Sequence, residues 1–192
     1  MSGVVYGLLW VLFNGVGRLF FRFRTEGVLH FPRTGGVIVA ANHASYLDIP
    51  LLGCAIPRRV VFLGRATLFP NRYLRWTLQK LGWIPLKTHR LDRQAFGQAL
   101  SHLQAGDPVV IFPEGTRTED GALHLGKPGL GYLVAESQCQ VIPAYISGTF
   151  KVLPIRSQWP RLFPIRVTFG KPLSFRKDEG DSSKAFYEKV SV

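Results

Sequence analysis

Apolar and polar residues follow two recurring patterns along the chain. Short, almost continuously apolar runs indicate strands buried on both faces, and they lie at residues 27–31, 37–40, 59–63, 108–112, 141–147 and 166–169. Longer segments between them have helical spacing or helix-end signals, and they lie at residues 45–55, 68–81, 91–104 and 128–137. This alternation predicts an α/β fold with a mainly parallel sheet flanked by helices.

The beginning of the chain has a different pattern. Residues 3–17 are almost wholly apolar but include Asn14, and this run is shorter than the roughly 20 residues that span a bilayer. Arg18, Arg22 and Arg24 follow the run, whereas a secretory signal has its basic residues in front. A core-packing helix and a true membrane span are alternatives, but the pattern favours an apolar helix that lies at the membrane interface.

The length of 192 residues suits one globular domain with an added segment at each end. We expect a membrane-associating helical segment at 1–24, the main α/β domain at 25–175 and a C-terminal tail at 176–192 with only a weak helical pattern.

The charge of the chain is strongly basic and unevenly placed. The net charge is +12, and residues 1–96 hold 13 Lys and Arg against 3 Asp and Glu, so that this half alone carries +10. A basic surface suits nucleic acid, anionic lipid or an anionic substrate. Because arginines directly follow the apolar run, the arrangement indicates an anionic membrane surface, and no nucleic-acid module or basic face with interleaved aromatics is found.

Cysteine and histidine usage indicates neither a disulfide framework nor a metal site. Cys54 and Cys139 form no C-x-x-C pair and lie in apolar surroundings, which predicts buried free thiols in a reducing compartment. The five histidines lack the spacing of zinc ligands, so we expect no metal.

The first polar motif is Asn42-His43-Ala44-Ser45-Tyr46-Leu47-Asp48, which follows the strand predicted at 37–40. His43 then lies on a strand-to-helix turn, and Asp48 is placed to accept a hydrogen bond from one imidazole nitrogen. That contact fixes the tautomer and makes the other nitrogen more basic, as a general base requires. The alternative is a capping-box variant in which Asp48 only stabilises the start of a helix.

The second polar motif is Phe112-Pro113-Glu114-Gly115-Thr116-Arg117, which follows the strand predicted at 108–112. Gly115 lets the backbone approach a ligand closely, and Arg117 offers a planar set of donors for a phosphate. Glu114 is suited to accept hydrogen bonds from substrate hydroxyls or to orient the arginine. The alternative is a surface turn with an ordinary Glu–Arg pair. Both motifs end strands, where sites in parallel sheets gather.

Together the two motifs resemble the glycerolipid acyltransferase family, specifically the 1-acylglycerol-3-phosphate acyltransferases, over about residues 25–150. The resemblance implies that His43 deprotonates the acceptor hydroxyl for attack on an acyl thioester and that Asp48 orients it. It also implies that the hexapeptide binds the acceptor's glycerol phosphate through its last four residues, Glu114, Gly115, Thr116 and Arg117.

Three weaker stretches also resemble family features. Arg65-Ala66-Thr67-Leu68 lies where the family usually has Lys-x-Glu-Leu, so Arg65 retains a phosphate-binding charge. Lys127-Pro128-Gly129 resembles a lysine–glycine element, with a proline-containing helix start as its alternative. Residues 141–144 resemble the family's proline-containing strand.

The resemblance implies transfer of an acyl group from acyl-CoA or acyl-acyl carrier protein to the sn-2 hydroxyl of 1-acylglycerol 3-phosphate, giving phosphatidate in phospholipid biosynthesis. No cofactor beyond the thioester donor is implied, and we expect the active site on the cytoplasmic face of the membrane. We further expect the acyl chains between the N-terminal segment and the sheet.

One departure from the family pattern keeps other acceptors open. Thr88 stands where the family usually has an arginine, and Lys87, His89 or Arg90 are the nearby sources of charge. An acyltransferase for another lyso-lipid, such as lyso-ornithine lipid or another lysophospholipid, is therefore the alternative. A non-catalytic basic membrane- or nucleic-acid-binding protein is a remote one, because it leaves both motifs unexplained.

Overall fold

The computed structural model of the chain describes residues 2–66, 71–87, 92–178, 180 and 182–191. The strands are β1 (Arg24–Glu26), β2 (Val37–Ala41), β3 (Val61–Arg65), β4 (Trp83–Leu86), β5 (Pro108–Ile111), β6 (Gln140–Ser147) and β7 (Arg166–Phe169). The helices are α1 (Ser2–Phe21), α2 (Asp48–Ala55), α3 (Arg72–Lys80), α4 (Arg93–Gln104), α5 (Gly129–Ser137), α6 (Thr149–Val152) and α7 (Ser183–Ser191), with a short 3₁₀ helix η1 (Val28–His30).

The strands form one sheet in the order β1-β7-β6-β2-β5-β3-β4. Neighbouring strands are parallel except β6 and β7, which are antiparallel. The predicted α/β fold with a mainly parallel sheet flanked by helices is therefore confirmed. In a sheet of this kind the carboxyl ends of parallel strands meet at one edge, and here that edge holds the ends of β2, β3, β5 and β6.

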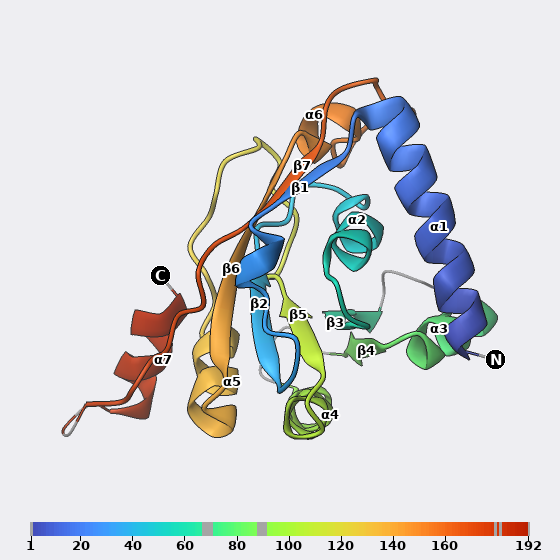
Figure 1. Cartoon of the computed structure of the whole chain (residues 1–192). Coiled ribbons are helices and arrows are strands. Elements are labelled where there is room, and N and C mark those ends of the chain that lie inside the picture. Colours follow the sequence, from blue (N-terminus) through green and yellow to red (C-terminus); the bar gives the residue numbers. More distant parts are fainter. Residues whose placement is uncertain (1, 67–70, 88–91, 179, 181, 192) are drawn as a thin grey trace.

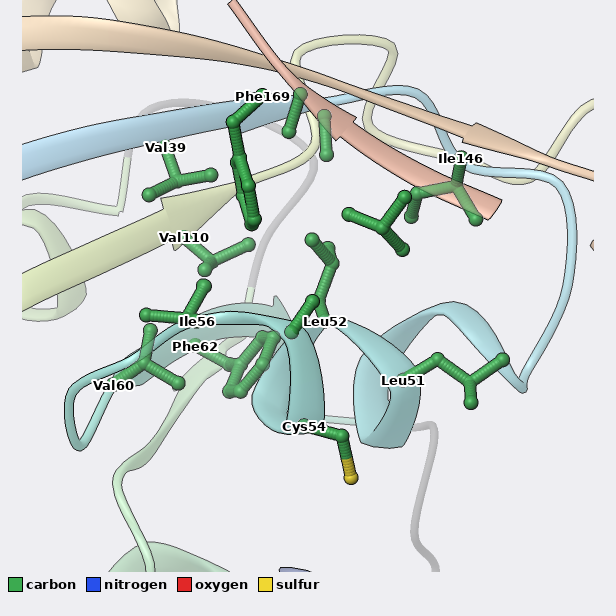
Figure 2. Packing of buried hydrophobic residues seen from close by; sticks show 14 of the residues in the cluster. Val39, Leu51, Leu52, Cys54, Ile56, Val60, Phe62, Val110, Ile146 and Phe169 are labelled. Carbon is green, nitrogen blue, oxygen red and sulfur yellow. The ribbon is translucent and has the colours of Figure 1, made fainter. Parts of the chain in front are cut away.

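Helices cover both faces of the sheet (Figure 1). Alternate residues of β2 pack into separate cores, Val37 and Val39 toward α2 and Ile38 toward α4 and α5. Figure 2 shows the first of these cores, in which Val39 and Val110 of the sheet face Leu52 of α2. The side-chain period of two in β2 thus explains why the strand is apolar at every position.

The prediction of a strand at residues 27–31 is wrong. Strand β1 ends at Glu26, and residues Val28–His30 form the 3₁₀ helix. Gly27 has a φ of 71°, which only glycine adopts readily, and a Cβ at this position would collide with the Phe169 carbonyl oxygen. The left-handed turn at Gly27 ends the strand and lets the chain cross the end of β7.

The other predicted elements occur with shifted bounds. The helix predicted at 45–55 begins at Asp48. The helices predicted at 68–81 and 91–104 begin at Arg72 and Arg93. Residues 67–70 and 88–91 lie outside the described part of the chain. The predictions omitted β1, β4, α6 and α7, which are short or weakly patterned.

The N-terminal helix extends beyond the apolar run to Phe21. Its segment Gly3–Phe21 has a mean hydropathy of 1.6 and is long and apolar enough to cross a membrane, by length and composition alone. One side of α1 packs on α2, where the Tyr6 hydroxyl donates to the Gly53 carbonyl at 3.4 Å and the Cys54 thiol to the Trp10 carbonyl at 3.7 Å. Burial raises the pKa of the Cys54 thiol to about 11. Cys54 and the half-buried Cys139 are both free.

The C-terminal helix α7 packs on α5 through buried Phe186 and Val190. The two helices approach closely at Gly131, where a Cβ would overlap the Tyr187 backbone, and the Gly131 N–H donates to the Ser191 hydroxyl at 3.2 Å. Residues Ser183–Ser191 therefore pack on the same layer of helices that covers the sheet.

We predict that Gly131→Ala lowers the free energy of unfolding by about 1–3 kcal/mol, because the added methyl group forces α7 away from α5. The matched control is Gly97→Ala on α4, where nothing lies within 4 Å of the added Cβ. This control should raise stability by about 0.5–1 kcal/mol through helix propensity. Urea unfolding measures both, and equal effects of the two substitutions would contradict the close packing at Gly131.

Candidate active site

Two turns lie side by side at the carboxyl ends of β2 and β5. The His43 N–H donates to Glu114 Oε1 at 3.0 Å, and the Thr118 N–H donates to the His43 carbonyl at 2.8 Å. The two polar motifs, which lie 71 residues apart at this contact, therefore form one structural unit.

His43 and Asp48 are in direct contact within this unit. His43 Nδ1 lies 2.9 Å from Asp48 Oδ2, and Asp48 is fully buried. A carboxylate only accepts hydrogen bonds, so Nδ1 carries the proton and Nε2 is the nitrogen with the free lone pair. This is the tautomer that a general base requires.

The Asp48 carboxylate also holds the backbone of the turn. Its Oδ2 accepts from the Ala44 and Ser45 N–H groups, each at 2.7 Å, so the carboxylate joins the start of α2 to the imidazole. Asp48 Oδ1 is buried without a hydrogen-bond partner among the described residues. Of the two alternatives in the sequence, the imidazole contact is present. The contact to the Ser45 N–H is one half of a capping box, but α2 begins at Asp48 and none of the described side chains caps it.

The His43 ring is fixed on a second side by Phe112. The two rings stack with centroids 4.0 Å apart and planes 18° from parallel. Phe112 directly follows β5 and begins the second motif, so this motif contacts the imidazole ring as well as the His43 backbone.

Glu114 lies behind the cavity wall. Its side chain is buried, and its two carboxylate oxygens accept from the backbone N–H groups of His43 (3.0 Å) and His124 (3.3 Å). In this arrangement the carboxylate ties together two segments of backbone.

A cavity of about 570 Å³ opens beside His43. Of the residues expected to bind substrate, Arg65, Gly115, Thr116, Arg117 and Lys127 line it. The cavity lies on the side of the sheet covered by α4 and α5. We expected the acyl chains between the N-terminal segment and the sheet. Helix α2 lies there, beside a second hollow lined by residues of α1, β1 and the end of α2.

The cationic part of the wall is built around Gly115 and Arg117. Gly115 has a φ of 69°, and a Cβ there would lie 3.0 Å from Lys127 Nζ, so the lysine ammonium closely approaches the glycine backbone. The Arg117 guanidinium stacks over the Tyr46 ring at 3.6 Å. Its Nη1 is buried without a hydrogen-bond partner among the described residues. Arg117 itself lines the cavity, where a planar guanidinium suits an anionic group.

The opposite part of the wall is apolar and aromatic, with Trp83, Phe96, Tyr132 and Tyr187 among its residues. Phe96 packs edge-to-face on Tyr132, and Tyr132 on Tyr187. Tyr187 comes from α7, which the sequence left within an unassigned tail. In the final residues, the four-residue spacing of Phe186 and Val190 is the sequence signal for a packed helix.

Two further polar residues of the first motif have structural roles that sequence reasoning missed. The Asn42 amide donates to the Ile146 carbonyl at 3.0 Å and accepts from the Ile146 N–H at 2.7 Å, which joins the end of β2 to β6. The Ser45 hydroxyl donates to the Leu153 carbonyl at 2.8 Å. These bonds hold the His43 turn from the side of β6.

Several residues that were compared with the family pattern lie outside the described part of the chain. These are Thr67 and Leu68 beside Arg65, and Thr88, His89 and Arg90 at the departure from the family pattern. Within the described part of the chain, no group of three His, Cys, Asp or Glu side chains is placed to hold a metal ion.

The fold and the His–Asp pair at its strand ends define an α/β protein with a candidate general base beside a cationic cavity. The Acyltransferase family model matches residues 22–147, and the chain belongs to this family.

A chloroplastic 1-acyl-sn-glycerol-3-phosphate acyltransferase of Arabidopsis thaliana is 30% identical over 144 residues, which cover 72% of this chain and 40% of that protein. The chain thus spans about two-fifths of that relative's length. A lyso-ornithine lipid O-acyltransferase of Pseudomonas aeruginosa is 33% identical over 108 residues, which cover 56% of this chain and 41% of that protein.

The crystal structure of the 1-acyl-sn-glycerophosphate acyltransferase PlsC from Thermotoga maritima has the same fold, with a TM-score of 0.77 at 24% identity. The likeness covers 99% of this chain and 78% of that one.

We predict that Glu114→Gln lowers the free energy of unfolding by about 1–3 kcal/mol, since one backbone N–H group loses its buried acceptor. Glu119→Gln is the matched control, because Glu119 is exposed and pairs only with Arg156. Its effect should stay within about 0.5 kcal/mol. Urea unfolding of both variants tests this. Unchanged stability with weaker substrate binding in Glu114→Gln would instead indicate direct contact with substrate.

Proposed function

We propose that the chain is an O-acyltransferase that moves a fatty acyl group from acyl-CoA or acyl-acyl carrier protein to the sn-2 hydroxyl of 1-acylglycerol 3-phosphate, giving phosphatidate in phospholipid biosynthesis. The observation that carries this proposal is the His43–Asp48 pair. His43 lines the same cavity as Arg65, Arg117 and Lys127. The name of the Arabidopsis thaliana relative supports the same acceptor.

In the proposed reaction, His43 Nε2 takes the proton of the acceptor hydroxyl. At the same time the oxygen of that hydroxyl attacks the carbonyl carbon of the thioester. The tetrahedral intermediate then breaks its C–S bond, the new ester remains, and the departing thiolate takes up the proton from the imidazolium. Asp48 stabilises the imidazolium without taking the proton. A general base of this kind contributes roughly 10²–10⁴-fold to the rate, and no cofactor beyond the thioester donor is needed.

The cavity has a part suited to each end of the acceptor. Arg65, Arg117 and Lys127 provide positive charge for the phosphate, and the planar guanidinium of Arg117 suits bidentate contact with its oxygens. The aromatic wall at Tyr132 and Tyr187 provides apolar surface for an acyl chain.

We also place the protein on the cytoplasmic face of an anionic membrane. The side of α1 that faces away from α2 exposes large apolar residues, among them Leu8, Leu19 and Phe20. Arg22 and Arg24 follow its end, and each cation near an anionic surface contributes about 1 kcal/mol. Basic residues beside apolar segments are enriched on the cytoplasmic side.

We predict that His43→Ala abolishes acyl transfer, with a loss of at least about 10²-fold. The variant should still fold and bind vesicles, with a free energy of unfolding lower by about 1–3 kcal/mol because buried Asp48 loses a donor. The matched control is His102→Ala. His102 Nδ1 lies 2.8 Å from Asp107 Oδ2 with the same five-residue spacing, but that pair is exposed and lies outside the cavity. Release of the free thiol from acyl-CoA measures turnover. Substantial activity of His43→Ala would refute the assignment of the base.

A second candidate function keeps the chemistry and changes the acceptor. The match to the lyso-ornithine lipid O-acyltransferase of Pseudomonas aeruginosa favours it. A purified-enzyme assay with 1-acylglycerol 3-phosphate, 1-acylglycerol and lyso-ornithine lipid separates the two candidates, since no preference for the phosphate-bearing acceptor would favour the second.

We predict that Arg117→Gln raises the KM for 1-acylglycerol 3-phosphate by about tenfold or more, because a charged hydrogen bond to the phosphate is lost. The KM for phosphate-free 1-acylglycerol should change little. Arg156→Gln is the control, because Arg156 is exposed and pairs with Glu119. An equal rise in KM for both acceptors would show that Arg117 does not recognise the phosphate.

A further inference from the structure

The loop between α6 and β7 exposes a cluster of large apolar side chains. All of residues 158–164 (QWPRLFP) are exposed, and Trp159 and Leu162 have 80% and 76% of their surface accessible. We call residues 158–164 the aromatic loop. An exposed tryptophan next to leucine and phenylalanine is unusual on a soluble surface and suits a membrane interface, where aromatic rings are enriched.

Hydrogen bonds give the aromatic loop a defined shape. The Arg161 N–H donates to the Val152 carbonyl at 2.8 Å, and the Ser157 hydroxyl donates to the Trp159 carbonyl at 2.9 Å. At its end the loop packs on Gly148, where a Cβ would collide with the Pro164 carbonyl oxygen. The backbone that carries the exposed apolar residues is therefore already ordered. Binding of the loop to a partner surface then costs less conformational entropy.

The aromatic loop continues the apolar surface of α1. The Ile165 N–H, directly after the loop, donates to the Phe21 carbonyl at the end of α1 at 2.9 Å. Leu19 and Phe20, in the last turn of α1, are exposed. Figure 1 shows α6 and this end of α1 at the same edge of the molecule.

The charge around the loop complements an anionic surface. The loop contains Arg161 and no acidic residue, and the Lys151 ammonium lies 4.6 Å from the centre of the Phe163 ring. The neighbouring carboxylates of Glu26 and Glu119 are each paired with an arginine, at 3.3 Å and 3.0 Å. Arg161 in the loop and Lys151 beside it therefore give this face positive charge.

We propose that the aromatic loop is a second membrane contact, which inserts Trp159, Leu162 and Phe163 into the interface of an anionic phospholipid bilayer beside α1. This rests on the membrane association proposed above for α1. The Ser45 hydroxyl donates to the Leu153 carbonyl, so the connection that carries the loop is hydrogen-bonded to the His43 turn at its start. The loop thereby orients the active site relative to the membrane surface.

The test uses the full chain with Cys139→Ser and an environment-sensitive fluorophore on a new cysteine, either Trp159→Cys or Leu29→Cys. Cys54 remains, because its pKa of about 11 keeps this buried thiol unreactive at neutral pH. Leu29 is 97% exposed and lies beyond the opposite end of β1, which makes it the matched control. Vesicles contain phosphatidylcholine alone or equal parts phosphatidylcholine and phosphatidylglycerol.

We expect the label at 159 to brighten and shift to the blue with phosphatidylglycerol vesicles, and the label at 29 to stay as in water. In the unlabelled protein, Trp159→Ala with Phe163→Ala should weaken vesicle partitioning by about tenfold or more, and Leu29→Ala should not. Arg161→Gln and Lys151→Gln should each weaken it about fivefold, only for the anionic vesicles.

The proposal is overturned if the protein binds vesicles while the label at 159 still reports water. It is also overturned if that label shifts without lipid as protein concentration rises, since the loop would then join two copies of the chain. Absence of all vesicle binding would overturn it together with the membrane role of α1. Thiol release with a detergent-dispersed acceptor tests acyl transfer without a membrane. Failure of the loop proposal can therefore be told apart from failure of the proposed function.

Discussion

The three hydrogen bonds to Asp48 Oδ2 are the constraint on which the candidate site depends. A fully buried carboxylate is costly unless donors surround it, and here the donors are the His43 imidazole and the Ala44 and Ser45 N–H groups. The same oxygen therefore fixes the backbone of the turn, the start of α2 and the imidazole tautomer. The carboxylate that orients the imidazole is thus the one that holds the turn, so the orientation of the His43 ring is coupled to the backbone that carries it.

The second motif reaches this turn through the register of the sheet. Ala40 of β2 pairs with Ile111 of β5, and three residues beyond them His43 and Glu114 meet in a 3.0 Å hydrogen bond. Parallel pairing places equivalent positions at one level, so the register alone brings the two turns together. The sequence predicted that both motifs end strands, and thus share an edge of the sheet. It did not predict that these strands are neighbours, because neighbour order depends on packing across the whole sheet.

Spacing alone would not have located the base. The chain contains a second histidine and aspartate five residues apart, His102 and Asp107, and their side chains also form a hydrogen bond, at 2.8 Å. That pair lies at the end of α4, before β5 and hence at the amino end of the strands, where no motif joins it. His43 was predicted as the base because two motifs agreed, and it stays the candidate. The contribution of Tyr187 could not be predicted in the same way, because it depends on α7 folding back onto α5 at Gly131.

The packing of α1 bears on how an apolar helix of this length meets a bilayer. Tyr6, Trp10 and Gly17, which span most of the helix, all contact α2 or its neighbours. A helix that crossed the membrane in this arrangement would carry α2, Arg58 and Arg59 with it into the hydrocarbon, which is costly for polar side chains. A helix lying in the plane of the interface keeps its outer face in lipid and its inner face on the protein. The mean hydropathy of α1 permits a span, but its contacts favour the in-plane arrangement.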